Sequence, residues 1–184
     1  MKPLSVRISG FGGQGIILTS IILGTAAVTK RNLYVVQTQS YGSEARGGQC
    51  QAELIISEQP IRSPSTKTKD ILVSLFQGAL DRYISTLKPD GILIIDPKLV
   101  NKIPTQNYTV YRVPATETAI QIGNRIVANM VMLGFLQPLI NLISEYDLKS
   151  VITDTVKEKF VDINLNAFNA GLNIAKVLKP IRRT

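Results

Sequence analysis

Short apolar segments alternate with helical patterns over the first two thirds of the chain. Runs of aliphatic and β-branched residues predict strands at 6–9, 33–37, 49–56, 71–75, 92–95 and 108–113. Helices are predicted between them at 15–29 and 78–87, and the turn residues 88–91 are expected to end the second helix. Beyond residue 114 the pattern is helical, with helices predicted at 116–122, 125–143, 147–159 and 163–178. Thr116 is a candidate helix cap, and Pro138 predicts a kink or break.

This order of elements predicts the fold class. Strands that are apolar throughout and alternate with helices are typical of a parallel sheet covered on both faces. We therefore predict an α/β chain with one Rossmann-like domain over residues 1–184, a mostly parallel sheet, helices on both faces and a helical C-terminal third. Polar residues and Pro138 interrupt the apolar segment 126–143, so we expect a buried helix there and no membrane association.

The first candidate site is a glycine-rich loop between the first predicted strand and helix. Its sequence Gly10-Phe11-Gly12-Gly13-Gln14-Gly15 contains the spacing G-x-G-x-x-G, which lets phosphate approach backbone N–H groups at a helix start. A dinucleotide site also needs an acidic residue after the second strand, but Val36-Gln37-Thr38 supplies none. We favour close packing or contact with another chain, and a nucleotide-binding oxidoreductase stays an alternative.

The second candidate site is the long loop that follows the second predicted strand. It contains Tyr41, Gly42, Glu44, Arg46, Gly47 and Gly48. Arg46 could bind a carboxylate or phosphate with two hydrogen bonds, or Glu44 could pair with it locally. One helix separates the two strands, so both loops should lie at the C-terminal edge of one parallel sheet, where ligands of open α/β sheets bind.

Composition narrows the chemistry. The chain has no histidine and only one cysteine, which excludes a Ser-His-Asp triad and a cysteine-ligated zinc or iron–sulfur site. We therefore predict neither catalytic residues nor a metal site on this chain. Cys50 is expected to be a packed strand thiol, and a single cysteine favours a reducing, cytoplasmic compartment. The net charge of +8 favours acidic or phosphate-bearing partners, but no basic run interleaves with aromatics, so nucleic acid is not expected.

Together the two loops resemble those of a known family. The segment 7–16 followed by 37–48 is similar to the gamma subunit of the 2-oxoacid:ferredoxin oxidoreductases, with further matching segments at 70–73, 91–94 and 129–134. Tyr41 and Ala45 make the second loop most similar to the 2-oxoglutarate branch, whereas Ser43 stands where proline is common.

The resemblance implies an accessory subunit of an enzyme that converts a 2-oxoacid, coenzyme A and oxidised ferredoxin into acyl-CoA, carbon dioxide and reduced ferredoxin. Thiamine diphosphate, magnesium and iron–sulfur clusters are expected on the partner alpha, beta and ferredoxin-like delta subunits, with none on this chain, which alone should be inactive. Pyruvate and branched-chain oxoacids are alternative substrates. Contacts to a partner subunit or coenzyme A are expected from Gly10, Gly12, Gly13, Gln14, Gly15, Tyr41, Gly42, Glu44, Arg46, Gly47 and Gly48.

Overall fold

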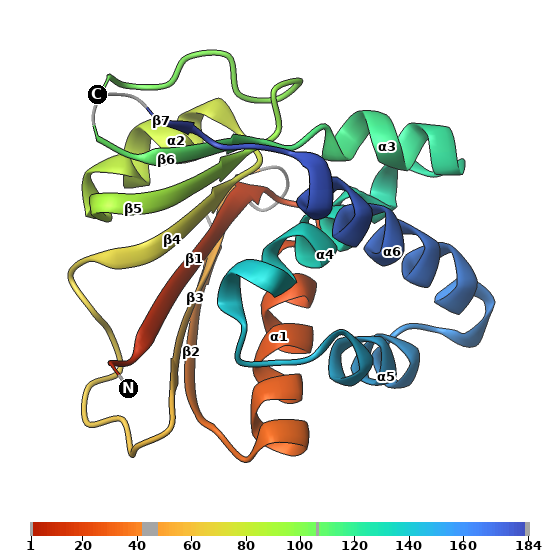
Figure 1. Ribbon diagram of the computed structural model, residues 1–184, viewed down its shortest axis with the longest axis horizontal. Coiled ribbons are helices and arrows are strands. Elements are labelled where there is room, and N and C mark those ends of the chain that lie inside the picture. The colour runs from red at the N-terminus through yellow and green to blue at the C-terminus, as the bar shows by residue number, and fades with distance from the viewer. Residues whose placement is uncertain (1, 42–47, 106, 183–184) are drawn as a thin grey trace.

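The computed structural model describes residues 2–41, 48–105 and 107–182. Within them, seven strands form a single sheet in the order β2-β3-β1-β4-β5-β6-β7 (Figure 1). The strands are β1 (Leu4–Phe11), β2 (Tyr34–Tyr41), β3 (Gln49–Ser57), β4 (Lys69–Ser74), β5 (Leu87–Ile95), β6 (Thr109–Arg112) and β7 (Ile181–Arg182). The helices are α1 (Ile16–Arg31), α2 (Gln77–Tyr83), α3 (Ala115–Ile122), α4 (Ala128–Ile140), α5 (Glu145–Thr155) and α6 (Val161–Val177), with short 3-10 helices η1 (Ile84–Thr86), η2 (Arg125–Val127) and η3 (Glu158–Phe160).

Strand direction confirms a mostly parallel sheet, with one strand that differs from the expected pattern. β1, β4, β5 and β6 pair in parallel, and β2 runs in the same direction because β3 is antiparallel to both β2 and β1. The direction of β3 follows from the length of its connection, since the seven residues between Tyr41 and Gln49 are too few for the crossover that a parallel neighbour would need. β7, which the sequence pattern did not predict, pairs antiparallel with β6.

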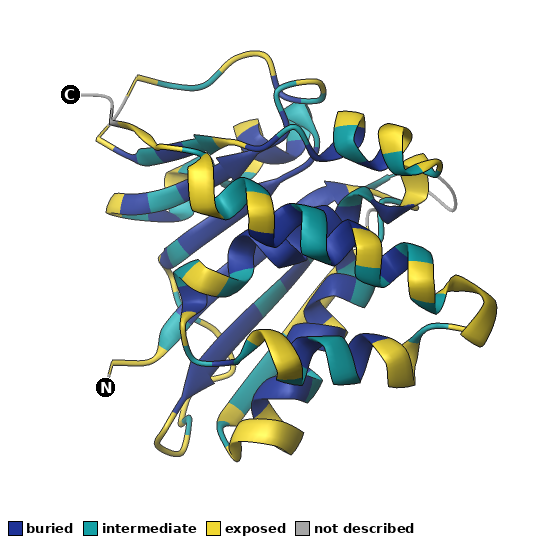
Figure 2. Cartoon of the chain, turned by 45° about the vertical axis from the view of Figure 1, so that its right-hand side comes forward, coloured by how far each residue is buried: buried dark blue, intermediate teal, exposed yellow. Residues whose placement is uncertain are grey.

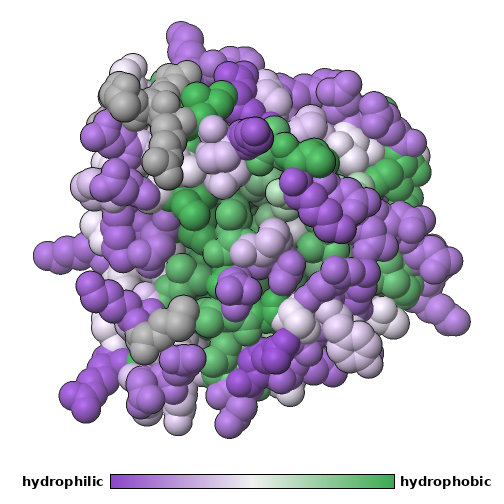
Figure 3. Space-filling model, in the orientation of Figure 1, coloured by the Kyte–Doolittle hydropathy of each residue, from purple (hydrophilic) through white to green (hydrophobic). Residues whose placement is uncertain are grey.

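Helices cover both faces of this sheet, as predicted. Alternate strand residues separate two apolar clusters: Ile8, Val73 and Ile94 face the larger one with α1, α4, α5 and α6, whereas Leu72 and Leu93 face the smaller one with α2. Figure 2 shows the buried positions of the strands and of α4 gathered in the interior, with exposed positions on the outer helix surfaces. In the space-filling view, hydrophilic side chains surround an apolar hollow on one face of the molecule (Figure 3).

Two glycines let α4 and α6 pack backbone to backbone. A Cβ atom on Gly134 would lie 2.0 Å from the carbonyl oxygen of Phe168, and one on Gly171 would lie 2.0 Å from that of Val131. This approach places α4 in the centre of the molecule with nine of its residues buried. The starts of α4 and α1 lie side by side as a result, and Asn129 of α4 donates to the carbonyl of Gly15.

The structure corrects several predicted element boundaries. Pro138 does not break α4, which continues to Ile140 and ends at Asn141 in the left-handed conformation. Thr116 does not cap α3, because the helix begins one residue earlier after Pro114, and the backbone N–H of Thr116 donates to the buried Asp96.

The predicted turn at 88–91 also differs, because β5 begins at Leu87 and runs through it. Asp90 takes a φ of 61° there, and the register with β4 shifts between Lys69 and Ile71. Pairing with β4 thus overrides the local turn signal. Among the described residues, no helix combines the length and apolar character that a membrane crossing requires.

Candidate functional site

The glycine-rich loop connects β1 to α1 at the C-terminal edge of the sheet. Gly15 caps α1 with a φ of 72°, and a Cβ there would lie 2.4 Å from the side-chain amide of Asn129, so both conformation and packing require glycine. Gly13 also has a positive φ, of 91°, but a Cβ added there would meet no atom within 4 Å. Gly13 is therefore the point where a ligand or partner can approach the loop backbone.

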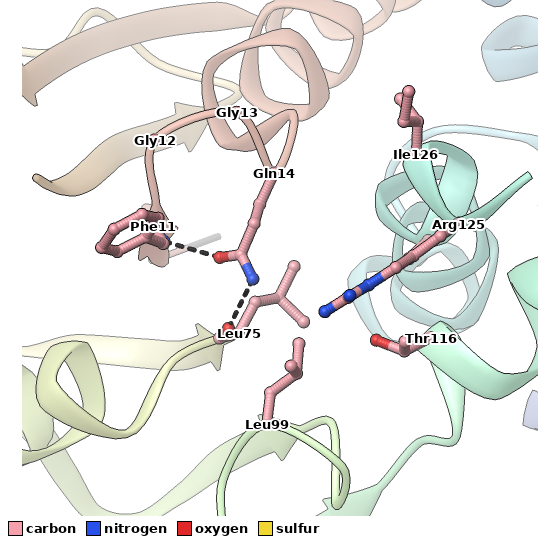
Figure 4. A pocket seen from close by; sticks show the side chains of 10 residues that line it. Phe11, Gly12, Gly13, Gln14, Leu75, Leu99, Thr116, Arg125 and Ile126 are labelled. Atoms are coloured by element: carbon pink, nitrogen blue, oxygen red, sulfur yellow. Dashed lines mark hydrogen bonds between the residues drawn. The ribbon is translucent and has the colours of Figure 1, made fainter. Parts of the chain in front are cut away.

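Gln14 holds the loop in place. Its side-chain oxygen accepts from the N–H of Phe11 at 2.6 Å, and its side-chain amide donates to the carbonyl of Leu75 at 2.9 Å (Figure 4). These two bonds fasten the loop to its own start and to the end of β4. We therefore assign Gln14 a positioning role, since both ends of its amide are already engaged.

The described ends of the second loop, at Tyr41 and Gly48, lie at the same edge of the sheet as the first loop, as predicted. The N–H of Gly12 donates to the carbonyl of Gly48 at 3.0 Å. Below this bond, Cys50 of β3 pairs with Gly10 on one side and with Tyr41 on the other. Tyr41 is 63% exposed at the end of β2. Gly42, Glu44, Arg46 and Gly47 lie outside the described residues, so their roles stay predictions.

A cavity of about 310 Å³ opens beside the first loop. The loop forms one wall, and the other walls come from segments that follow β4 and β5 and from the starts of α3 and α4. Arg125 of η2 extends its guanidinium into this space (Figure 4). The lining residues are Phe11, Gly12, Gly13, Gln14, Leu75, Leu99, Thr116, Arg125, Ile126 and Ala128.

A second cavity, of about 360 Å³, lies on the other side of the same loop. Gly13 and Ile126 line both spaces, so the two cavities are neighbours. The second one lies between the start of α1, the start of α4 and the segment around η3. Its lining is largely apolar and includes Leu18, Val127, Val156, Phe160 and Ile163.

The charges that line the two cavities are all positive. Arg125 is the charged residue of the first lining and Lys157 that of the second, and no described acidic residue lines either space. Within the described ranges, the guanidinium of Arg125 has no ion pair or hydrogen bond, and Asn124 is occupied in capping η2 through the N–H of Ile126 at 3.0 Å. Since α1 also begins here without a side-chain cap, this edge favours an anion.

Sequence reasoning found the loop but missed most of the cavity wall. Leu75, Leu99 and Thr116 each follow a parallel strand, and the rule that ligands bind beyond the carboxyl ends of such strands could have identified them. Cys50, by contrast, is the packed thiol that was expected. It is 4% exposed, and burial raises its pKa, so it does not provide a thiolate.

Comparisons with known proteins agree with this architecture. The family model described as pyruvate ferredoxin/flavodoxin oxidoreductase matches residues 5–174. The 2-oxoglutarate synthase subunit KorC of Methanocaldococcus jannaschii is 46% identical over 94% of each chain. The crystal structure of the keto/oxoacid ferredoxin oxidoreductase gamma subunit from Geobacter sulfurreducens superposes with a TM-score of 0.84 at 38% identity, over 94% of this chain and 98% of that one.

A larger structure contains the same fold as one part of its chain. The 2-oxoglutarate:ferredoxin oxidoreductase from Magnetococcus marinus, with 2-oxoglutarate, coenzyme A and succinyl-CoA bound, matches 99% of this chain and 32% of its own, with a TM-score of 0.86 at 28% identity. The family match over most of the sequence, the KorC relative and the shared fold agree with the resemblance of the two glycine loops. This chain belongs to the pyruvate ferredoxin/flavodoxin oxidoreductase family and is a subunit of an oxoacid oxidoreductase.

Proposed function

We propose that this chain is the accessory gamma subunit of a 2-oxoglutarate:ferredoxin oxidoreductase and that its two cavities bind coenzyme A. The observation that carries the coenzyme A assignment is the pair of neighbouring cavities at the glycine loop, whose described charges are all positive. Coenzyme A carries a diphosphate and a further phosphate on an otherwise largely uncharged chain. It therefore needs cations at one place and apolar contacts at another.

The residues at the loop suit such a ligand. The guanidinium of Arg125 can donate two parallel hydrogen bonds to a phosphate. The open backbone at Gly13 allows a phosphate to approach, and the uncapped start of α1 adds a favourable dipole. The second cavity, lined by residues such as Phe160 and Ile163, suits the less polar part of the molecule.

In this proposal the assembled enzyme converts 2-oxoglutarate, coenzyme A and oxidised ferredoxin into succinyl-CoA, carbon dioxide and reduced ferredoxin. Alpha, beta and ferredoxin-like delta subunits hold thiamine diphosphate, magnesium and iron–sulfur clusters. The similarity to KorC and to the Magnetococcus marinus enzyme supports this substrate, with pyruvate and branched-chain oxoacids as alternatives. The single cysteine supports a cytoplasmic location.

The coenzyme A contact is tested by Arg125→Gln in the assembled enzyme, with initial rates measured against coenzyme A concentration. A charged hydrogen bond to phosphate at this exposed position is worth about 1–2 kcal/mol, so the KM for coenzyme A should rise about five- to thirtyfold while kcat changes little. Arg62→Gln is the matched control, because Arg62 is exposed in the loop between β3 and β4, at the end of the strands opposite to the glycine loop. An unchanged KM in Arg125→Gln would refute the contact.

The subunit assignment is tested separately by purifying the tagged chain from its host without oxygen. We expect alpha, beta and ferredoxin-like chains in equal amounts, with thiamine diphosphate and an iron–sulfur chromophore. A chain that emerges alone and colourless would contradict the assignment. The alternative of a nucleotide-binding oxidoreductase would then be tested by NAD and FAD binding, although Val36-Gln37-Thr38 in β2 still lacks the acidic residue that a dinucleotide ribose requires.

A further inference from the structure

The lateral edge of the sheet, which is formed by β2 and differs from the C-terminal edge with the glycine loop, is open to a partner. β2 is the terminal strand of the sheet order, so one side of its backbone pairs with β3 and the other side has no strand in the described part of the chain. Its pairing with β3 is continuous from Tyr34 to Tyr41. The free edge therefore offers a regular row of backbone donors and acceptors about 27 Å long.

This edge lacks the features that normally prevent strand pairing. The sequence Tyr-Val-Val-Gln-Thr-Gln-Ser-Tyr contains no charged residue and no proline, and its register with β3 has no shift. Natural sheets usually protect a free edge with lysine, proline, a bulge or a covering element. An unprotected edge of this length is suited to adding a strand.

The helix beside β2 presents an apolar stripe toward the same side. Ser20 and Gly24 of α1 contact β2, since Gln37 donates to the hydroxyl of Ser20 and a Cβ on Gly24 would meet Val35. The positions just outside them around the helix include Ile21 and Val28, which are 40% and 49% exposed. Figure 1 shows α1 running beside β2, and the exposed Ile21 and Val28 therefore border the free strand edge.

A two-fold axis perpendicular to the sheet would pair the free edges of β2 from two copies and would also place their α1 helices side by side. Two antiparallel copies of β2 about 4.8 Å apart would each lie about 2.4 Å from that axis. Because α1 packs over both β2 and β3, its axis would lie about 5 Å away, so the two α1 helices would be about 10 Å apart. This is an ordinary helix-packing distance, at which Ile21 of the two copies would meet.

The register of such a pair follows from the faces of the strand. A two-fold axis perpendicular to the sheet leaves each strand face on the same side of the joined sheet. Directly opposite residues must therefore have side chains on the same face, which requires the axis to pass beside one residue of β2 and its symmetry mate, not between two residues. An axis at Thr38 would place Val35 of one copy opposite Tyr41 of the other, which is a favourable aliphatic–aromatic pair. Lys30, in the last turn of α1, would then lie far from its symmetry mate, because the two helices would be antiparallel.

From this complementarity we propose that a second copy of this chain pairs with β2 about a two-fold axis at Thr38, joining two seven-stranded sheets into one. The contact combines a backbone ladder with the α1 stripe. It is independent of the proposed function, because it uses neither cavity.

The test is the mass of the purified full chain by sedimentation over a range of concentrations. The parent chain should reach twice its monomer mass of 20.2 kDa. Thr38→Lys, which places like charges opposite each other, and Ile21→Glu should both return it to the monomer mass. Val177→Lys is the control, since Val177 is 77% exposed at the end of α6, away from this edge, and should leave the dimer intact. Circular dichroism verifies that each variant is folded.

A cross-link tests the register without weakening the contact. Thr38→Cys would place two thiols on directly opposite residues, whose Cα separation of about 4.5–5.5 Å allows a disulfide. Oxidation should then link two copies of this chain, in isolation and in the assembled enzyme, whereas Thr153→Cys on α5 should not. A parent chain that stays monomeric, a dimer that survives both edge variants, or a cross-link to a different subunit would each overturn the proposal.

Discussion

The close approach of α4 and α6 allows one substitution to be worked out in detail. In Gly134→Ala the new Cβ would lie 2.0 Å from the carbonyl oxygen of Phe168, whereas ordinary contact begins at 3.4 Å. The helices must therefore separate by up to about 1.4 Å, and a gap of that size removes much of the attraction between facing side chains. In an unconstrained helix the same change would stabilise the protein by about 1 kcal/mol.

The two effects oppose each other, and overpacking should dominate. Overpacking a core costs about 1–3 kcal/mol and occasionally more, and here the obstruction is backbone that cannot rotate away, so we expect about 3–4 kcal/mol and a net loss of about 2–3 kcal/mol. For a chain of this size that lowers Tm by roughly 10 °C.

The assay is thermal and urea unfolding of the full chain. Gly78→Ala in α2 is the control, because its new Cβ would meet only side-chain atoms of Gln49 and Phe76, at 2.9 Å, which can move. We expect that variant to stay within about 1 kcal/mol of the parent. A Gly134→Ala chain as stable as the parent would show that the helices can slide apart without loss, and would refute the reasoning.

Three further predictions concern charge, capping and the thiol. Burial raises the pKa of Glu53, but hydrogen bonds from Lys69 and Arg7 outweigh this effect and hold the pKa below its usual range. The ionised Glu53 carboxylate therefore stabilises the fold at neutral pH, and this stabilisation is lost as the pH falls through the lowered pKa. Glu53→Gln should lower the free energy of unfolding by about 3–5 kcal/mol at pH 7, because Lys69 is 1% exposed and would lose the carboxylate that pairs with its charge. Urea titrations at a series of pH values should also show a smaller loss of stability at acid pH than in the parent chain, and an unchanged loss would contradict this prediction. Ser144→Ala removes the capping box at the start of α5 and should cost about 1 kcal/mol in the same titration, whereas no loss would mean that water replaces the cap. A thiol reagent should modify Cys50 only as fast as the chain opens, and immediate labelling in the native state would show that the thiol is accessible.

Most strands could be located from the sequence, because runs of β-branched residues have few other stable environments. The direction of the strand at 49–56 was not predicted, since nothing within that segment distinguishes a parallel strand from an antiparallel one and only the preceding connection decides it. The turn predicted at 88–91 failed for a related reason. Proline, aspartate and glycine favour a turn locally, but Asp90 takes a positive φ and the ladder to β4 continues around it.

The candidate site was predictable only in part. The glycine loop has a local signature, and its place at the end of a strand followed from that signature. The local sequence at Asn124-Arg125 predicts a helix start, where a phosphate can bind or Asn124 can simply cap the helix. It does not predict that tertiary packing brings Arg125 to the same cavity as Gly13. The roles of Gly15 and Asn129 were equally hidden, because their contact joins two helix starts that are far apart in the chain.

The return of β3 between β2 and β1 has a mechanical consequence. β3 pairs with β1 over the whole length from Leu4 to Phe11 and with β2 from Tyr34 to Tyr41, and the bond from Gly12 to Gly48 closes the upper end. The strands that carry the two loops are therefore hydrogen-bonded into one rigid part of the sheet and cannot move relative to each other. If this edge moves toward or away from a neighbouring subunit during turnover, the whole sheet must travel with it. The bend that allows such a movement would then have to lie outside the sheet.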